Sequence, residues 1–124
     1  MLLMEKKKIL YAEDEELLFR LASRVLDGKY SLEHALDIES ALSKAKINDY
    51  DAFLCDGLEG KWIQLYDLTR TEDKYQNSPF VVYTSNGKVI NEVTHLMFSD
   101  SNLRLLQKPM EIAEFKKSIE SILN

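Results

Sequence analysis

The sequence is poor in the residues that cross-link or interrupt a chain: it holds one cysteine, two prolines and four glycines. A single cysteine excludes a disulfide within the chain and is typical of a reducing compartment. We interpret this residue, Cys55, as a small buried apolar side chain of a strand rather than as a reactive thiol. No repeat, low-complexity tract or linker interrupts the 124 residues. Residues 1–124 are therefore expected to form one domain.

Long apolar runs and an excess of positive charge are also missing. No run approaches the ~20 apolar residues that cross a bilayer. The N-terminal "MLLM" is too short for a signal-peptide core, and its lysines follow the apolar residues instead of preceding them. The net charge of −5 provides no basic field for a phosphate backbone or an anionic lipid. We expect a cytoplasmic protein that has no direct nucleic-acid partner and no membrane partner.

Apolar residues make up 45% of the chain and charged residues 30%, a balance typical of a globular protein. Apolar and β-branched runs predict five strands, at 8–12, 30–36, 52–56, 80–84 and 103–107. Helical spacing predicts five helices, at 15–28, 37–47, 62–71, 88–97 and 109–124. Asp37 is the expected N-cap of the second helix. In the first and last helices, Leu18, Leu21, Ala22, Val25, Ile112, Phe115, Ile119 and Ile122 are expected to face inward.

Strands that alternate with helices at this spacing predict an α/β fold, a parallel sheet with helices on both faces. In such sheets ligands bind beyond the carboxyl ends of the strands. The residues at the predicted strand ends are Glu13 and Asp14, Asp56, Thr84, and Lys108. No glycine-rich phosphate loop opens a helix, which argues against a nucleotide-binding relative of this architecture.

Three carboxylates, one hydroxyl and one ammonium group would meet at one edge of this sheet. Carboxylates packed together repel, and Mg²⁺, which prefers oxygen ligands and keeps several waters, would hold them ionised. Asp56 could then act as a carboxylate nucleophile that forms an acyl phosphate. Lys108 could neutralise charge during phosphoryl transfer, and the Thr84 hydroxyl could donate to a phosphoryl oxygen.

Each of these residues also has an ordinary structural explanation. Acidic residues are favoured in the first turn of a helix, which is our interpretation of Glu15 and Glu16. For Glu13 and Asp14, a functional role and helix capping are equally supported by the local sequence. The acid at 56 could be a turn residue before glycine, the threonine an ordinary strand residue and the lysine an exposed one. Their coincidence with four strand ends favours a site. His34 and His95 stand at no metal-ligand spacing, and neither is assigned a role.

The segments "ILYAED", "DAFLCD", "PFVVYTS" and "LLQKP" resemble, in order and spacing, a receiver domain of two-component response regulators, of the chemotaxis-regulator type. The resemblance covers nearly the whole chain. It implies a flavodoxin-like, doubly wound fold with strand order 2-1-3-4-5 and five helices. It also implies that a sensor histidine kinase donates a phosphoryl group from phosphohistidine to Asp56, and that a downstream effector then binds differently.

The same resemblance assigns roles to single residues. It implies that Glu13 and Asp14 are the acidic pair that binds Mg²⁺ together with Asp56, and that the backbone carbonyl of Leu58 completes the shell. It implies three further roles: a switch hydroxyl for Thr84, an invariant lysine for Lys108, and a small side chain at Ser85 that leaves the phosphoryl group access.

Two features depart from the receiver pattern. The segment "GLEGKW" after Asp56 lacks the usual Met-Pro and is shortened by a residue or two. Leu105 stands where receivers carry the aromatic switch residue, three positions before the lysine. Tyr83 is no replacement, because strand alternation directs it to the opposite side of its strand from Thr84.

Three functions compete at this point. The first is a phosphorylatable switch whose phosphorylation and dephosphorylation are self-catalysed. The second is a receiver-like docking module that works independently of phosphorylation, which the two departures favour. The third is a small phosphohydrolase of the haloacid dehalogenase type, which is disfavoured because Leu58 stands where such enzymes place a second aspartate. The sequence names neither the kinase nor the effector, and it does not fix the oligomeric state.

Overall fold

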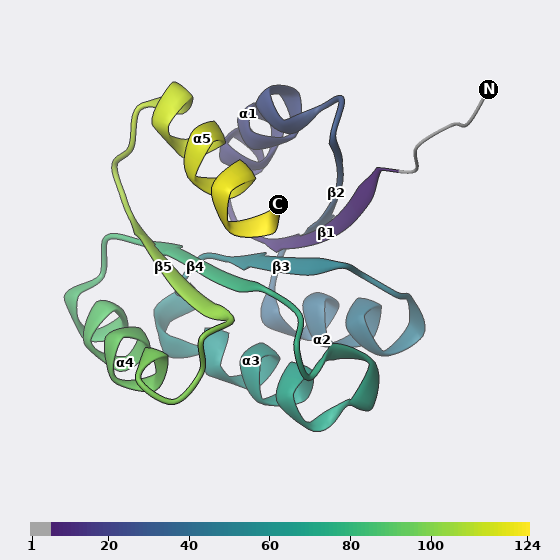
Figure 1. Cartoon of the computed structure of the whole chain (residues 1–124), viewed down its shortest axis with the longest axis vertical. Helices are drawn as coiled ribbons and strands as arrows, with labels where there is room; N and C mark the ends of the chain where they lie inside the picture. Colours follow the sequence, from purple (N-terminus) through teal and green to yellow (C-terminus); the bar gives the residue numbers. More distant parts are fainter. Residues whose placement is uncertain (1–5) are drawn as a thin grey trace.

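The computed structural model describes residues 6–124, in which a parallel sheet lies between two layers of helices (Figure 1). The "MLLM" segment discussed above lies outside the described residues. The strands are β1 (Lys7–Ala12), β2 (Tyr30–Ala35), β3 (Ala52–Cys55), β4 (Phe80–Thr84) and β5 (Leu103–Gln107). The helices are α1 (Glu16–Leu26), α2 (Ile38–Ile47), α3 (Trp62–Thr71), α4 (Gly87–Met97) and α5 (Ile112–Leu123), with short 3₁₀ turns η1 (Leu58–Gly60) and η2 (Asp73–Tyr75). Within 6–124, no helix combines the length and the apolar composition that crossing a membrane requires.

All neighbouring strands pair in parallel, in the order β2-β1-β3-β4-β5. This is the predicted flavodoxin-like topology, with five strands and five α-helices, as expected, among residues 6–124. Helices α1 and α5 cover one face of the sheet, and α2, α3 and α4 cover the other (Figure 1). The central strand β3 is buried along its whole length, which explains its continuous apolar sequence.

Each face of the sheet carries its own apolar core. On the α2–α3–α4 side, aromatic rings from β3, α3 and β4 pack edge to face or stacked, with Phe53, Trp62 and Phe80 among the fully buried ones. Trp62, Tyr66 and Tyr75 are all buried in this core. On the α1–α5 side, apolar residues of β1, β3 and β4 pack against α1 and α5.

Side-chain caps fix the start of two helices, one of which, at Asp37, was predicted. The Asp37 carboxylate accepts a hydrogen bond from the backbone N–H of Ser40, with a distance of 2.8 Å, at the start of α2. The Asn86 side chain accepts one from the N–H of Val89, at 3.1 Å, and starts α4 directly after β4. These caps satisfy backbone donors that the first turn of a helix leaves unpaired.

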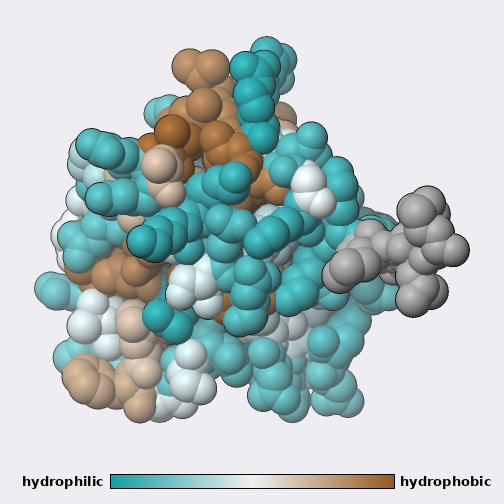
Figure 2. All heavy atoms as spheres, turned by 45° about the horizontal axis from the view of Figure 1, so that its top comes forward, coloured by the Kyte–Doolittle hydropathy of each residue, from teal (hydrophilic) through white to brown (hydrophobic). Residues whose placement is uncertain are grey.

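Two residues expected to face inward are exposed instead. Leu21 of α1 is 46% exposed and Ile112 of α5 is 42% exposed. Both line a cavity of about 210 Å³ between the two helices, together with Phe115. Because the helices do not close over this end of the sheet, their helical spacing directs the side chains to the rim of the cavity rather than into the core. Figure 2 shows an apolar area at this end of the molecule.

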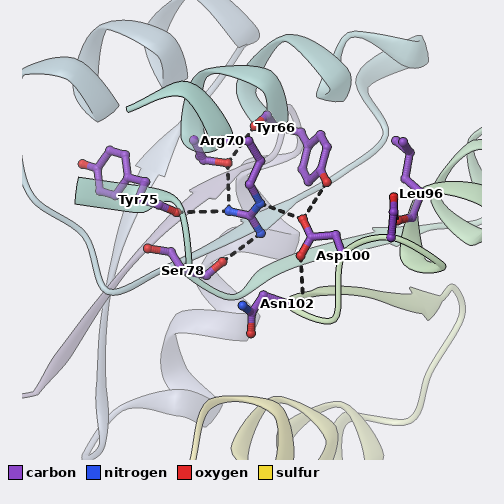
Figure 3. Close-up of polar contacts among 9 residues, drawn as sticks. Tyr66, Arg70, Tyr75, Ser78, Leu96, Asp100 and Asn102 are labelled. Carbon is purple, nitrogen blue, oxygen red and sulfur yellow. Dashed lines mark hydrogen bonds and ion pairs between the residues drawn. The ribbon is translucent and has the colours of Figure 1, made fainter. Parts of the chain in front are cut away.

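A polar cluster ties α3 to the loops that precede β4 and β5 (Figure 3). These loops lead into the amino-terminal ends of the two strands, whereas Asp56 follows the carboxyl end of β3. Arg70 Nε lies 2.7 Å from Asp100 Oδ2, which also accepts a hydrogen bond from the Tyr66 hydroxyl at 2.6 Å. The other guanidinium nitrogens donate to the carbonyl oxygens of Tyr75 and Ser78, at 3.1 and 3.0 Å. Both charged side chains are largely buried, so the cluster fixes the α4–β5 loop against α3.

Candidate functional site

The sheet delivers three carboxylates to one place. The backbone N–H of Glu13 donates to Ala35 and that of Asp56 to Ala12, both at 2.9 Å, so parallel pairing continues past the ends of β1 and β3. As a result, carboxylate oxygens of Glu13, Asp14 and Asp56 all lie within 4.8 Å of one another. The structure thus brings together the acids that the strand ends predicted.

Glu13 is the buried member of the three, with no exposed surface. Burial, followed by the nearby charge of Asp56, raises the pKa of Glu13 to about 7, and the Lys108 ammonium acts in the opposite direction. The carboxylate accepts hydrogen bonds from the Tyr11 hydroxyl at 3.1 Å and from the backbone N–H of Glu15 at 3.3 Å. A buried carboxylate needs such donors because it has lost its water.

Lys108 follows the edge strand β5, and its side chain reaches back to the acids. Its Nζ lies 3.2 Å from Glu13 Oε1 and 3.6 Å from Asp56 Oδ1, and it stands 5.2 Å from the centre of the Tyr83 ring. Burial lowers the pKa of Lys108, but the carboxylates of Asp56 and Glu13 raise it by more, so the net shift of this pKa is upward. The backbone N–H of Lys108 donates to the Thr84 carbonyl at 3.0 Å, which extends the β4–β5 pairing as far as the site.

Asp56 presents its carboxylate to an open cleft of about 350 Å³. Its Oδ1 accepts a hydrogen bond from the N–H of Gly57, at 2.7 Å, and faces Lys108. Its Oδ2 accepts no hydrogen bond from any residue of the described part of the chain, so its lone pairs are available to a ligand. The predicted site residues that line the cleft are Asp14, Asp56, Leu58, Thr84, Ser85 and Lys108; Glu13 lies beneath it.

Thr84 lies buried beside the loop after Asp56, and its Oγ1 accepts a hydrogen bond from the N–H of Asn86 at 3.1 Å. A Cβ atom on Gly57 would stand only 3.1 Å from this Oγ1 and 3.1 Å from a methyl group of Val89. The absence of a side chain at Gly57 therefore allows the loop after Asp56 to approach the threonine closely.

The loop after Asp56 has an uncommon backbone. Leu58 and Glu59 adopt positive φ angles of 49° and 56°, a conformation that costs non-glycine residues about 1 kcal/mol or more each. The Leu58 carbonyl, the predicted backbone ligand, accepts a hydrogen bond from the N–H of Lys61 at 3.0 Å. Its role in a metal shell stays a prediction.

The donor set suits a hard divalent cation. Three carboxylate oxygens converge, and two of the acids border a cleft with room for water and for phosphate oxygens. Oxygen ligands of this kind, with space for retained water, match the preferences of Mg²⁺. Nitrogen and sulfur ligands, which zinc favours, do not take part in this group.

Two residues that touch the site, Tyr11 and His34, are not indicated by the sequence pattern. Tyr11 falls in an apolar strand segment, and His34 has no metal-ligand spacing. His34 Nε2 lies 2.6 Å from the carbonyl oxygen of Glu13, and its ring stacks on Phe19 with centroids 4.1 Å apart. The i, i+2 spacing of Tyr11 and Glu13 on one strand was a usable signal, whereas the contact of His34 depends on the β1–β2 register.

Leu105, which stands at the aromatic switch position of receivers, and Tyr83 lie on opposite faces of the sheet. Leu105 is half-buried and packs against the core on the α4 side of the sheet. Tyr83 packs on Phe115 of α5, with centroids 5.1 Å apart, whereas Thr84 contacts the α4 side. The prediction that these two neighbours point in opposite directions is confirmed.

Comparison with solved structures finds the same fold in response regulators. The chain superimposes on the chemotaxis response regulator CheY4 of Vibrio cholerae with a TM-score of 0.81 and 21% identity, over 96% of this chain and 100% of that one. The chain has the receiver fold. A response regulator from Thermotoga maritima aligns at a TM-score of 0.76 with 12% identity, over 96% of this chain and 98% of the other.

A response regulator is also found by comparison of the sequence with curated proteins. The chain is 28% identical over 116 residues to the response regulator ArlR of Staphylococcus haemolyticus, which covers 93% of this chain. It spans 52% of the length of that relative. No protein-family model matches the sequence. The acids that follow β1 and β3 and the lysine that follows β5 therefore meet at one edge of a receiver fold.

Proposed function

We propose that this chain is a phosphorylatable signalling switch that accepts a phosphoryl group on Asp56. The observation that carries the proposal is the position of the Asp56 carboxylate, which opens to the cleft while Lys108 and two further acids surround it. A sensor histidine kinase would supply the group as phosphohistidine. An Asp56 oxygen forms a bond to phosphorus as the phosphorus–nitrogen bond of the donor breaks, and that electron pair returns to the imidazole nitrogen.

The surrounding residues would divide the work of this transfer. We assign Glu13, Asp14, Asp56 and the Leu58 carbonyl to a Mg²⁺ site. When bound, Mg²⁺ supplies positive charge that offsets the charge on the acids and on the incoming phosphoryl oxygens. Lys108, already 3.6 Å from Asp56, would place a second positive charge beside the same oxygens.

Thr84 and Ser85 would contact the phosphoryl group from the β4 side of the cleft. The Thr84 hydroxyl can donate a hydrogen bond to a phosphoryl oxygen while its own oxygen keeps accepting from Asn86. Ser85 has a small side chain that borders the cleft, so the phosphoryl group can enter. Hydrolysis of the acyl phosphate by water would return Asp56 to its carboxylate form and end the signal.

The output would be a change in the binding of an effector protein in the cytoplasm. Because the chain spans about half the length of the curated relative it matches, the activity of any longer protein is part of the proposal. A second candidate is a docking module that works independently of phosphorylation. Leu105, a small apolar residue already packed against the core, favours it, because a bulky ring is not there to move with Thr84.

One experiment separates the candidates. The protein is incubated with Mg²⁺ and a small acyl-phosphate donor and then weighed by intact-mass spectrometry. The switch predicts an adduct of one phosphoryl group that is absent in Asp56→Asn. A folded protein that binds Mg²⁺ but forms no adduct indicates the docking module. Release of phosphate over many turnovers, without a lasting adduct, indicates a phosphohydrolase.

A further inference from the structure

The buried side chain of Tyr11 lies directly beneath the acidic site. It belongs to β1, and Glu13, two positions later and directly after the end of that strand, points to the same side. Its ring borders the cavity between α1 and α5 on one side, and its hydroxyl reaches the Glu13 carboxylate on the other. Tyr11 itself is 1% exposed, so this hydroxyl has no alternative partner in bulk water.

The hydrogen bonds at Glu13 divide between its two oxygens. Oε1 accepts from the Tyr11 hydroxyl, at 3.1 Å, and from Lys108 Nζ, at 3.2 Å. Oε2 accepts from the N–H of Glu15, at 3.3 Å. The first oxygen thus has a donor for each lone pair, and the second keeps one lone pair for another partner.

These contacts restrict a side chain that is otherwise free to turn. Glutamate has one more rotatable bond than aspartate, so its carboxylate needs more support to stay in one place. The Tyr11 hydroxyl belongs to a rigid, fully packed ring on the same strand, and a donor of this kind holds its acceptor at little entropic cost.

We propose that Tyr11 is a positioning residue of the cation site. Its hydroxyl holds the Glu13 carboxylate in the orientation in which this carboxylate also contacts Lys108. In this way Tyr11 sets the affinity of the three acids for a divalent cation. The inference rests on the proposed function, because it requires that the acids bind Mg²⁺. It adds a residue outside the acidic group to the determinants of that binding.

Tyr83→Phe provides a matched control. Tyr83 is a half-buried tyrosine that lines the same cavity as Tyr11, and its ring lies beside the ammonium group of Lys108. Its hydroxyl makes no hydrogen bond to a residue within 6–124. Removal of this hydroxyl therefore reproduces the chemical change of Tyr11→Phe without the loss of a donor to Glu13.

The test is a calorimetric titration of the metal-free protein with MgCl₂. The wild type and Tyr83→Phe are expected to bind with the same dissociation constant, and Tyr11→Phe about ten-fold more weakly, as removal of a partner behind a metal ligand typically produces. An affinity of Tyr11→Phe within two-fold of the wild type overturns the role of Tyr11. A wild type that binds no Mg²⁺ contradicts the proposed function instead, so the two failures are distinguishable.

A double-mutant cycle shows whether the effect passes through Glu13. In a Glu13→Gln background, adding Tyr11→Phe is expected to change the Mg²⁺ affinity by less than two-fold, because the carboxylate that the hydroxyl positions is gone. A full ten-fold loss in that background overturns the proposal. Should Tyr11→Phe not fold, as judged by thermal unfolding without metal, Tyr11→Met removes the same hydroxyl and serves in both titrations.

Discussion

The ammonium group of Lys108 lies 3.2 Å from the carboxylate of Glu13, although 95 positions separate the two residues in the sequence. The contact joins the residue that follows β1 to the residue that follows β5. Since Lys108 also faces Asp56, one ammonium group offsets the charge of two acids at the edge of the sheet. The electrostatic balance of the metal-free site therefore depends on this lysine.

Replacement of Lys108 by methionine is expected to lower the free energy of unfolding of the metal-free protein. The change leaves the Glu13 and Asp56 carboxylates without their cation, and we expect a loss of about 2 kcal/mol, below the 3–5 kcal/mol of a fully buried pair because Lys108 is partly exposed. Urea unfolding followed by circular dichroism measures it. Lys61→Met, at an exposed lysine of the loop after Asp56, is the control; an equal loss in both variants contradicts the expected role of Lys108.

Magnesium is expected to raise the melting temperature, because it binds the folded acids and not the unfolded chain. At one hundred times its dissociation constant the gain is about 2.7 kcal/mol. Asp14→Asn should abolish the gain and also stabilise the metal-free protein, since one of three mutually repelling charges is removed. Differential scanning calorimetry with and without MgCl₂ measures both effects.

Asp67→Asn is the matched control for the magnesium prediction. Asp67 is exposed on α3, and its carboxylate makes no hydrogen bond or ion pair to a residue of the described chain. Its replacement removes the same charge but should leave the response to magnesium intact. A wild-type melting temperature that does not respond to magnesium counts against the site itself.

Asp100→Asn is expected to reduce stability by about 2 kcal/mol at neutral pH, because it weakens a largely buried ion pair with Arg70. Burial raises the pKa of Asp100, but hydrogen bonds from Tyr66, Arg70 and a backbone N–H outweigh it, and the net pKa lies below the usual 3.8. The contribution of a carboxyl with a lowered pKa is present above its unfolded pKa and disappears as the pH falls through the folded one.

The stability difference between the wild type and Asp100→Asn should therefore stay constant from about pH 5 to 8 and shrink below about pH 4. Urea unfolding across this range gives the profile. Asp49→Asn breaks an ion pair to Lys74 in which the aspartate side chain is 90% exposed, and it should change stability little at any pH. A difference for Asp100→Asn that persists unchanged at pH 3 contradicts the assignment.

Gly57→Ala is expected to destabilise the protein by about 1–2 kcal/mol and to disturb the position of Thr84. The added methyl group would stand 3.1 Å from the Thr84 hydroxyl and from a methyl group of Val89, so one of them must move. Urea unfolding measures the stability, and the NMR chemical shifts of Thr84 report its displacement. Gly87→Ala, where an added Cβ meets no atom within 4 Å, is the control. Equal effects of both substitutions would contradict the close approach.

The pattern of strands and helices, and the resemblance to receiver domains, were sufficient to predict the topology. Parallel strands that alternate with helices share one carboxyl edge, so residues 13, 14, 56, 84 and 108 had to lie there. Asp37 was also predictable, because its cap depends on three neighbouring residues. These features follow from local sequence and from one topological rule.

The features that were missed depend on contacts between elements. The ion pair of Arg70 with Asp100 joins residues 30 positions apart, and no local pattern of either residue indicates it. Leu21 and Ile112 match an inward-facing stripe, yet the gap between α1 and α5 leaves them at the rim of a cavity. Helical periodicity predicts which face turns to the protein, but it does not predict how closely two helices pack.

The backbone conformation of the loop after Asp56 could not be predicted from the sequence either. The shortened segment indicated an unusual loop shape, but it did not indicate which residues adopt positive φ angles. In the structure these residues are Leu58 and Glu59, in the short connection between β3 and α3. Non-glycine residues rarely adopt this conformation, so residue identity did not predict it.

The central claim, that a phosphoryl group forms on Asp56, is tested most directly by locating the modified residue. The protein is treated with Mg²⁺ and an acyl-phosphate donor and reduced with borohydride, which converts an aspartyl phosphate to homoserine, and its peptides are sequenced by mass spectrometry. Homoserine is expected at position 56, at no other aspartate, and not at all when Mg²⁺ or the donor is omitted. An unmodified Asp56, or homoserine at another aspartate of the folded protein, would contradict it.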